Sequence, residues 1–167
     1  MTPEVVKKAR AFAVKVHGDQ QYKNDLPYIV HLFAVETVLR RFGVEDENIR
    51  AAAYLHDVLE DTTYQTATIE IGFGDVIANM VDLVTNPKVG TRKEKHAFSY
   101  PRIAESTSAT ILKVADRIAN VEAAGLFDMY VKEYPEFRKH LRGSRWLTPE
   151  LNDMWVHLDR LMDYMGA

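Results

Sequence analysis

The sequence predicts an all-α protein, and three observations support that fold class. Apolar residues recur at spacings of three and four along most of the chain, which is the period of an amphipathic helix. No segment shows a convincing alternation of apolar and polar residues, which is the pattern of a half-buried strand. The chain has 167 residues, without an internal repeat or a low-complexity linker. We therefore expect one helical domain that spans residues 1–167.

The N-terminal half is expected to form helices separated by turn-forming residues. Thr2 is a candidate cap for the first helix, with Pro3 at the first helical position. The polar run 17–27 indicates a loop. Gly43 is a suitable stop for the second helix, and Asp46 can cap the third. The helices after the loop are expected at residues 28–42, 47–59, 66–71 and 75–84.

The C-terminal half begins with a polar, cationic segment. Residues 85–101 are predicted to form a loop that holds no more than one helical turn. Trp146, Met154 and Trp155 are expected in the core rather than in a binding site. Three further helices are expected at residues 109–124, 127–141 and 149–165.

Composition excludes several classes of function. The net charge of −3 argues against a protein that coats nucleic acid, although it leaves room for a small anionic ligand. The absence of cysteine excludes disulfides, thiolate zinc sites and cysteine nucleophiles. No apolar run approaches the roughly 18 residues of a membrane helix, and no targeting segment is evident. We expect a cytoplasmic protein without a membrane partner, and the sequence leaves its oligomeric state open.

The segment AAAYLHDVLEDT carries the first candidate site. His56 and Asp57 follow three alanines of a predicted buried helix, where a histidine and carboxylates are costly unless each has a partner. The alternative is a surface histidine beside a solvated acidic helix end, but acidic residues prefer helix N-termini. On one continuous helix, Glu60 shares the face of His56 and Asp57.

Two further residues are candidate metal ligands. His31 lies among apolar residues in PYIVHLFAV, where a satisfied core histidine is the alternative interpretation. Asp116 lies in the apolar helix ILKVADRIAN, where an ion pair with Lys113 or Arg117 is the alternative. Two histidines and two aspartates from three helices would form a mixed nitrogen and oxygen site for a divalent ion, with positions left for water or substrate.

Four segments together resemble a known family. HGDQQYKNDLPYIVH, AAAYLHDVLEDT, VDLVT and ILKVADRIAN occur in the order and spacing of the HD-domain hydrolases of the RelA/SpoT alarmone family, above all its small single-domain members. The resemblance covers about residues 9–122 and implies an HD helical bundle that holds Mn²⁺, although another divalent ion is an alternative. It places His31, His56, Asp57 and Asp116 on the metal, Glu60 and Asp61 on the attacking water, and Asn120 opposite the nucleotide ribose.

The sequence also departs from this family pattern. The sequence has Tyr22-Lys23 where the family usually has Arg-Lys. In the family the arginine of this pair packs on the purine. Tyr22 is therefore expected to stack on the base in its place or to mark a different base preference, with Lys23 beside it at the substrate. Leu32 replaces a customary proline, and ADRIAN lacks a histidine found in the family's ADRLHN.

The cationic segment RKEKHAFSYPRI offers a phosphate-binding hypothesis. Lys93 and His96 are candidates to bind substrate phosphates, because polyphosphate esters need cations to offset their charge. Solvated surface charge is the simpler alternative.

These observations lead to a functional hypothesis. We expect a metal-dependent hydrolase of a phosphorylated nucleotide, with (p)ppGpp as substrate, loss of its 3′-pyrophosphate as the reaction and a role in the stringent response. A phosphatase acting on NADPH or a deoxynucleotide is one alternative, which Tyr22 keeps open. A non-catalytic nucleotide sensor is the other, although such a protein has no need of Glu60 and Asp61.

Overall fold

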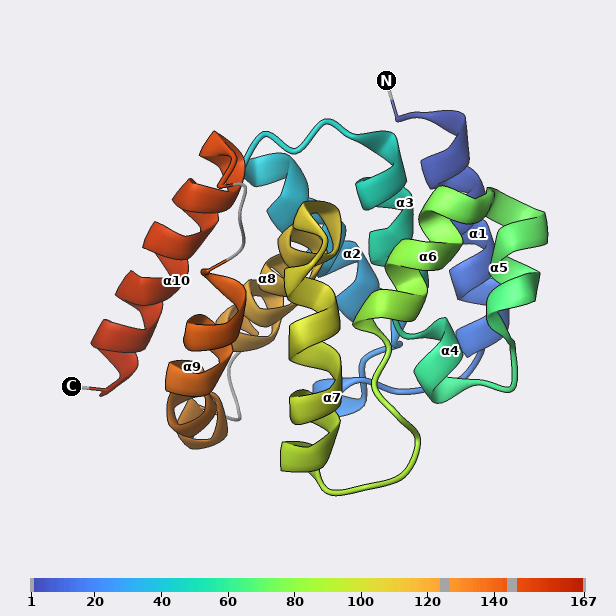
Figure 1. The fold of residues 1–167 in the computed structure, drawn as a ribbon. Helices are drawn as coiled ribbons and strands as arrows, with labels where there is room; N and C mark the ends of the chain where they lie inside the picture. Colours follow the sequence, from blue (N-terminus) through green and yellow to red (C-terminus); the bar gives the residue numbers. More distant parts are fainter. Residues whose placement is uncertain (1, 124–126, 144–146, 167) are drawn as a thin grey trace.

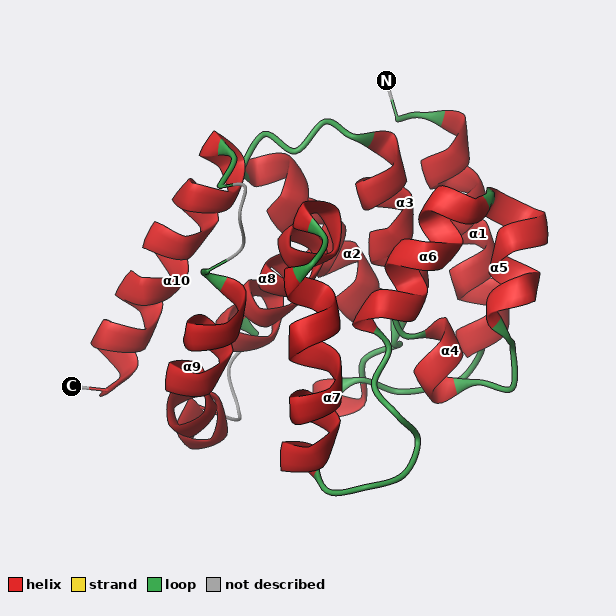
Figure 2. Ribbon diagram, in the orientation of Figure 1, coloured by secondary structure: helices red, strands yellow, loops and turns green. Residues whose placement is uncertain are grey.

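The computed structural model describes residues 2–123, 127–143 and 147–166. In these ranges the chain is helical without a β-strand, apart from an isolated bridge between Gln21 and Pro27, so the all-α prediction is confirmed (Figure 2). None of the helices in these ranges is long and apolar enough to cross a membrane. The helices are α1 (Glu4–His17), the 3₁₀ helix η1 (Lys23–Asp25), α2 (Ile29–Arg41), α3 (Glu47–Leu55), α4 (Val58–Asp61), α5 (Thr66–Phe73), α6 (Asp75–Val84), α7 (Arg92–Ala104), α8 (Thr107–Glu122), α9 (Phe127–Leu141) and α10 (Pro149–Gly166).

Helices α3 and α8 are the centre of the packing. Helix α3 contacts α1, α2, α6 and α8, and α8 also contacts α2, α7, α9 and α10. Figure 1 shows α1, α5 and α6 on one side of the bundle and α9 and α10 on the other, with α7 between them in front. Ala51, Ala52 and Ala53 of α3 are fully buried, and their small side chains let the neighbouring helices approach closely. This packing brings the start of α2, the end of α3 and the middle of α8 together.

The hydrophobic core extends over both halves of the chain. It includes Val6 near one end and Met162 near the other. Met154 and Trp155 are fully buried, so their predicted place in the core is confirmed. Trp146, predicted to share it, lies outside the described residues.

The start of the first helix differs from the prediction. Pro3, with φ −57° and ψ 151°, occupies the N-cap position in place of Thr2, and no side chain caps the helix. The extended ψ of Pro3 leaves it outside the helix, which therefore begins at Glu4. The cap predicted at Asp46 is confirmed, because its side chain accepts a hydrogen bond from Asn48 N at 2.8 Å.

The continuous helix predicted for residues 47–59 is wrong, because α3 ends at Leu55 and α4 begins at Val58. The Nδ1 atom of His56 lies 2.9 Å from the carbonyl oxygen of Ala53, which a continuous helix would pair with the N–H of Asp57. Asp57, with φ −98° and ψ −5°, instead occupies the N-cap position of α4. The break separates Glu60 from the helix that ends before His56.

The loop predicted for residues 85–101 is also wrong over most of its length, because α7 occupies Arg92–Ala104. A capping box starts this helix: Thr91 accepts a hydrogen bond from Glu94 N, and the Glu94 side chain accepts one from Thr91 N. These reciprocal bonds satisfy backbone donors in the first turn and stabilise a helix in a segment dominated by charged residues.

Candidate metal centre and active site

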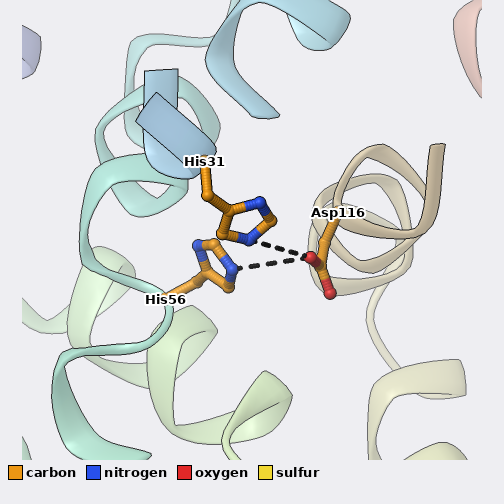
Figure 3. A group of neighbouring side chains, drawn as sticks. All are labelled: His31, His56 and Asp116. Atoms are coloured by element: carbon orange, nitrogen blue, oxygen red, sulfur yellow. Dashed lines mark ion pairs between the residues drawn. The ribbon is translucent and has the colours of Figure 1, made fainter. Parts of the chain in front are cut away.

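Four side chains from α2, α8 and the break between α3 and α4 converge on one point. His31 lies in the first turn of α2, His56 and Asp57 lie at the break, and Asp116 lies in the middle of α8. His31 Nε2 is 3.3 Å from Asp116 Oδ1 and 3.6 Å from Asp57 Oδ2. His56 Nε2 is 3.0 Å from Asp57 Oδ2 and 3.7 Å from Asp116 Oδ1. Figure 3 shows both imidazole rings directed at the Asp116 carboxylate.

The chemistry of the two histidines fits a metal ion. Both rings are almost completely buried. Because His56 Nδ1 faces a backbone carbonyl oxygen, it carries a proton in either protonation state, which leaves Nε2 as the ring nitrogen that can bind a metal ion. This Nε2 is buried beside the Asp57 and Asp116 carboxylates, and no contact with hydrogen-bond geometry satisfies it among the described residues. A backbone carbonyl that orients the far nitrogen is typical of a metal-binding histidine, and His31, His56 and Asp116 together can hold a divalent ion.

The carboxylates of the site are kept ionised. Burial opposes ionisation, but neighbouring His56 and His31 hold the pKa of Asp57 well below its ordinary value. Burial is likewise outweighed at Asp116, whose pKa is lowered by Lys113 and the two histidines. The pKa of His56 is raised above its ordinary value by Asp57 and Asp116 despite complete burial. Two anionic carboxylates therefore face the space between the imidazoles, as a cation site requires.

Three neighbouring side chains orient the aspartates. The Tyr28 hydroxyl donates to Asp57 Oδ2 at 2.7 Å. Lys113 Nζ donates to Asp116 Oδ2 at 2.9 Å, and Asn120 Nδ2 donates to Asp116 Oδ1 at 2.6 Å. The ion pair considered for Asp116 therefore exists with Lys113, but it uses Oδ2 and leaves Oδ1 facing the histidines. Arg117, the other candidate partner, binds Glu133 instead at 3.2 Å.

The two predicted catalytic carboxylates occupy different surroundings. Glu60 Oε2 accepts hydrogen bonds from the backbone and side-chain nitrogens of Asn86, each at 3.2 Å. Asp61 is exposed, and its Oδ2 accepts a hydrogen bond from Gln20 Nε2 at 2.8 Å. Glu60 and Asp57 line the same pocket. The prediction that Glu60 shares a helix face with His56 and Asp57 assumed one continuous helix, which the structure divides into α3 and α4.

A pocket of about 160 Å³ lies over these groups. Its wall contains both carboxylates of the metal site and a set of cationic side chains, so it can accept an anionic ligand next to a metal ion. It is lined by Tyr22, Tyr28, His31, Asp57, Glu60, Asn86, Arg92, His96, Lys113, Asp116, Arg117, Asn120 and Tyr130.

Comparison with known proteins identifies the family. The profile described as "HD domain" matches residues 9–128, most of the chain and all four converging side chains. The chain belongs to the HD-domain family.

Two relatives place this HD-domain protein more closely. It is 30% identical over 154 residues to the protein of Xenopus tropicalis named guanosine-3′,5′-bis(diphosphate) 3′-pyrophosphohydrolase MESH1, covering 84% of this chain and 86% of that protein. It is 37% identical over 130 residues to the guanosine-3′,5′-bis(diphosphate) 3′-pyrophosphohydrolase of Aquifex aeolicus, covering 74% of this chain but spanning only 18% of that relative.

A solved structure supports the fold. A metazoan ortholog of SpoT, described as hydrolysing ppGpp, superposes with a TM-score of 0.76 over 95% of this chain and 97% of that one, at 24% identity.

Among the predicted substrate-binding residues, Tyr22 and Lys23 both contact Asn120. The Tyr22 ring stacks on His31 with 4.9 Å between ring centroids, and its hydroxyl donates to Asn120 Oδ1 at 2.9 Å. Lys23 Nζ donates to the Asn120 carbonyl oxygen at 3.1 Å. One face of Tyr22 therefore covers His31, a candidate metal ligand.

The two candidate phosphate-binding residues separate along α7, and burial lowers the pKa of His96 to about 4, so that its imidazole is neutral near pH 7. His96 lines the pocket and stacks on Tyr100, with 4.7 Å between ring centroids. Lys93 is exposed and lines a neighbouring groove between α7 and α9 instead. The guanidinium groups of Arg92 and Arg117 reach the pocket wall, and both bind the carboxylate of Glu133.

Some lining residues had no assigned role in the sequence. The sequence indicates Lys113 only as an ion-pair partner of Asp116, through their spacing of three residues on a helix. Tyr28 is part of the PYI-x-H motif. Asn86 and Tyr130 stand alone in polar or mixed segments, and no local spacing identifies them.

Proposed function

We propose that this HD-domain protein is a Mn²⁺-dependent hydrolase that removes the 3′-pyrophosphate from (p)ppGpp. The observation that carries the proposal is the convergence of two buried imidazoles and two ionised carboxylates beside a pocket walled by cations. The names of the two hydrolase relatives support the choice of substrate, and the 86% coverage of the Xenopus protein supports it for the chain as a whole.

In this proposal His31, His56, Asp57 and Asp116 hold the ion. When bound, such an ion polarises a phosphoryl oxygen and promotes deprotonation of water. Lys113 keeps Asp116 ionised and oriented, and the Tyr28 hydroxyl orients Asp57 by its hydrogen bond.

The substrate-facing roles are assigned to residues in and around the pocket. Glu60 takes a proton from the attacking water, and Asp61 orients that water or Glu60 from the side. Asn120 faces the ribose, and Tyr22 and Lys23 line the space that the base occupies. Lys93 of α7 binds outer phosphates as a cation, whereas His96 binds them as a neutral imidazole donor, because burial lowers its pKa to about 4. Charge-assisted hydrogen bonds from cations are the strongest contacts available to a polyphosphate.

The proposal includes the organisation and location of the protein. Residues 1–167 are treated as one domain, which the shared core of α1 and α10 supports. A small-molecule nucleotide is the partner rather than nucleic acid, consistent with a net charge of −3. A cytoplasmic location follows from that substrate.

A second candidate is a phosphatase acting on NADPH or a deoxynucleotide. The position of Tyr22 favours keeping it, because a ring stacked on His31 replaces the arginine that the family usually directs at a purine. The two candidates differ in product, since the first releases pyrophosphate and the second orthophosphate.

A panel assay tests both candidates. Purified protein with Mn²⁺ is incubated with ppGpp, pppGpp, NADPH and deoxynucleoside triphosphates, and the products are resolved by ion-exchange chromatography. Pyrophosphate release from ppGpp that is lost in Asp116→Asn but retained in the surface variant His157→Ala is the expected result. Turnover of NADPH or deoxynucleotides alone would favour the second candidate, and no turnover of any nucleotide would refute both.

A further inference from the structure

His17 has no role in the site described above, yet it is buried directly behind it. It is the last residue of α1 and is 6% exposed. Its imidazole stacks on the Tyr28 ring with 4.7 Å between centroids and an interplanar angle of 19°. Tyr28 in turn donates its hydroxyl proton to Asp57. His17 is therefore separated from a metal-site carboxylate by a single aromatic ring.

Gln20 connects His17 to Asp61 by two hydrogen bonds. Gln20 Nε2 donates to Asp61 Oδ2 at 2.8 Å. An ionised carboxylate only accepts, so this bond fixes the orientation of the Gln20 amide. Gln20 Oε1 then faces His17 Nδ1 at 2.8 Å and must accept from it. The donors therefore point in one direction, from His17 through Gln20 to Asp61.

The backbone of Gln20 is fixed as well as its side chain. Gln20 N donates to the His17 carbonyl oxygen at 2.8 Å, and Tyr28 N donates to the Gln20 carbonyl oxygen at 2.9 Å. The bridge between Gln21 and Pro27 closes the same loop. Gln20 is thus held at three points before its amide reaches Asp61.

Asp61 has few other constraints. It is the last residue of α4, a helix of only four residues, and its side chain is exposed. Among the described residues, Gln20 is the hydrogen-bond partner of its carboxylate. The backbone N–H of Asp61 donates to the carbonyl oxygen of Asp57 at 2.9 Å, so Asp61 lies one helical turn after a proposed metal ligand. A free carboxylate at this point would sample several rotamers, and fixing one of them costs side-chain entropy.

We propose that Gln20, held by His17, is a positioning residue that fixes the orientation of the Asp61 carboxylate at the end of α4. The inference rests on the proposed function, because it assumes that Asp61 orients the attacking water or Glu60. It adds two residues to the reaction that act through Asp61 without touching the substrate. A misplacement of about 1 Å can cost roughly 10²-fold in rate, so loss of the Gln20 amide is expected to lower kcat by roughly ten- to a hundredfold.

The experiment is a double-mutant cycle on kcat. Gln20→Ala, Asp61→Asn and the double variant are compared with the wild-type protein, using the nucleotide that it turns over and saturating Mn²⁺. If Gln20 acts through Asp61, the double variant is no slower than Asp61→Asn alone, and KM and Mn²⁺ affinity, the latter measured by calorimetry, stay unchanged. If the two losses multiply, Gln20 does not act through Asp61 and the inference is overturned.

Two further variants guard against loss of folding. Gln20→Glu keeps the shape and the acceptor for His17 but offers Asp61 a like charge, so kcat falls while the circular dichroism spectrum is retained. His17→Phe keeps a ring to stack on Tyr28 but removes the donor to Gln20, and a smaller loss of kcat that vanishes in the Asp61→Asn background is expected. Wild-type kcat in both variants would overturn the inference.

Gln21→Ala is the matched control. Gln21 is the exposed neighbour of Gln20 and takes part in the bridge to Pro27. Its kcat should equal that of the wild type, and a loss as large as that of Gln20→Ala would reassign the effect to the loop and overturn the inference. If the wild-type protein turns over no nucleotide, the proposed function fails and this inference fails with it.

Discussion

Replacing Lys113 by Met removes one buried ion pair next to the candidate metal centre. Lys113 Nζ lies 2.9 Å from Asp116 Oδ2, and the side chains are only 14% and 12% exposed. At an effective dielectric constant of about 20, such a contact contributes about 6 kcal/mol of Coulomb energy, which the cost of burying the ammonium group partly offsets. Removing one partner from a buried pair typically costs about 3–5 kcal/mol. Because Asn120 and the histidines still contact Asp116, we expect a loss of about 3 kcal/mol for Lys113→Met, at the lower end of that range.

The pH dependence of this loss has a defined sign. The pKa of Asp116 in the folded protein lies well below its ordinary value, with Lys113 as the largest cause that opposes burial. The stabilisation is therefore complete above the unfolded pKa of about 3.9 and is lost as the pH falls through the folded pKa. The difference in unfolding free energy between wild type and Lys113→Met should be constant between about pH 5 and 8 and shrink below about pH 4.

Urea unfolding in the presence of EDTA measures this difference, and the chain supplies a matched control. Lys7 pairs with Glu4 at the same spacing of three residues and at 3.2 Å, but the two side chains are 53% and 87% exposed. Lys7→Met is expected to cost no more than about 1 kcal/mol. Equal losses in the two variants, or a Lys113→Met loss that persists unchanged at acid pH, would refute this account of how Asp116 is kept ionised.

Three further predictions concern the proposed chemistry. His56→Ala should lose Mn²⁺ in metal analysis while His157→Ala retains it, and full occupancy in both would remove His56 from the metal site. Glu60→Gln should lower kcat by about 10²–10⁴-fold with Mn²⁺ and KM retained, because the amide keeps the volume but not the basicity; loss of metal would instead make Glu60 a ligand. A Lys93→Ala/His96→Ala double variant should raise KM with kcat nearly unchanged if both residues bind phosphates in ground and transition states alike, and an unaltered KM would favour simple surface charge.

The convergence of the metal-site side chains could be anticipated from the sequence for a physical reason. His31, His56 and Asp116 are polar residues in strongly apolar helices, and burial of such groups requires partners. Each had a simpler explanation when taken alone, so the prediction depended on the combination. The structure places these three together with Asp57, and the ion pair of Asp116 coexists with this arrangement.

The predictions that failed depend on local interactions that hydrophobic periodicity does not detect. The break at His56 depends on a side-chain bond to a backbone carbonyl, and both flanking segments keep helical spacing. The segment of α7 is predicted as a loop because its many charged residues lack an apolar period. The spacing T-x-x-E nevertheless encodes the Thr91–Glu94 capping box that starts the helix. Asn86 and Tyr130 reach the pocket through packing between distant helices, so a single sequence holds no local signal for them.

The loop between α1 and α2 makes completion of the candidate metal centre a late step of folding. Its hydrogen bonds join residues 29, 41 and 98 positions apart, from Tyr28 to Asp57, from Gln20 to Asp61 and from Tyr22 to Asn120. Contacts of such separation close large loops, whose entropy cost must be met before the contacts stabilise anything. The helices can form from local bonds, whereas the centre is complete only after α8 has docked on the N-terminal helices. After dilution from urea, recovery of Mn²⁺ binding should therefore lag behind recovery of the helical circular dichroism signal.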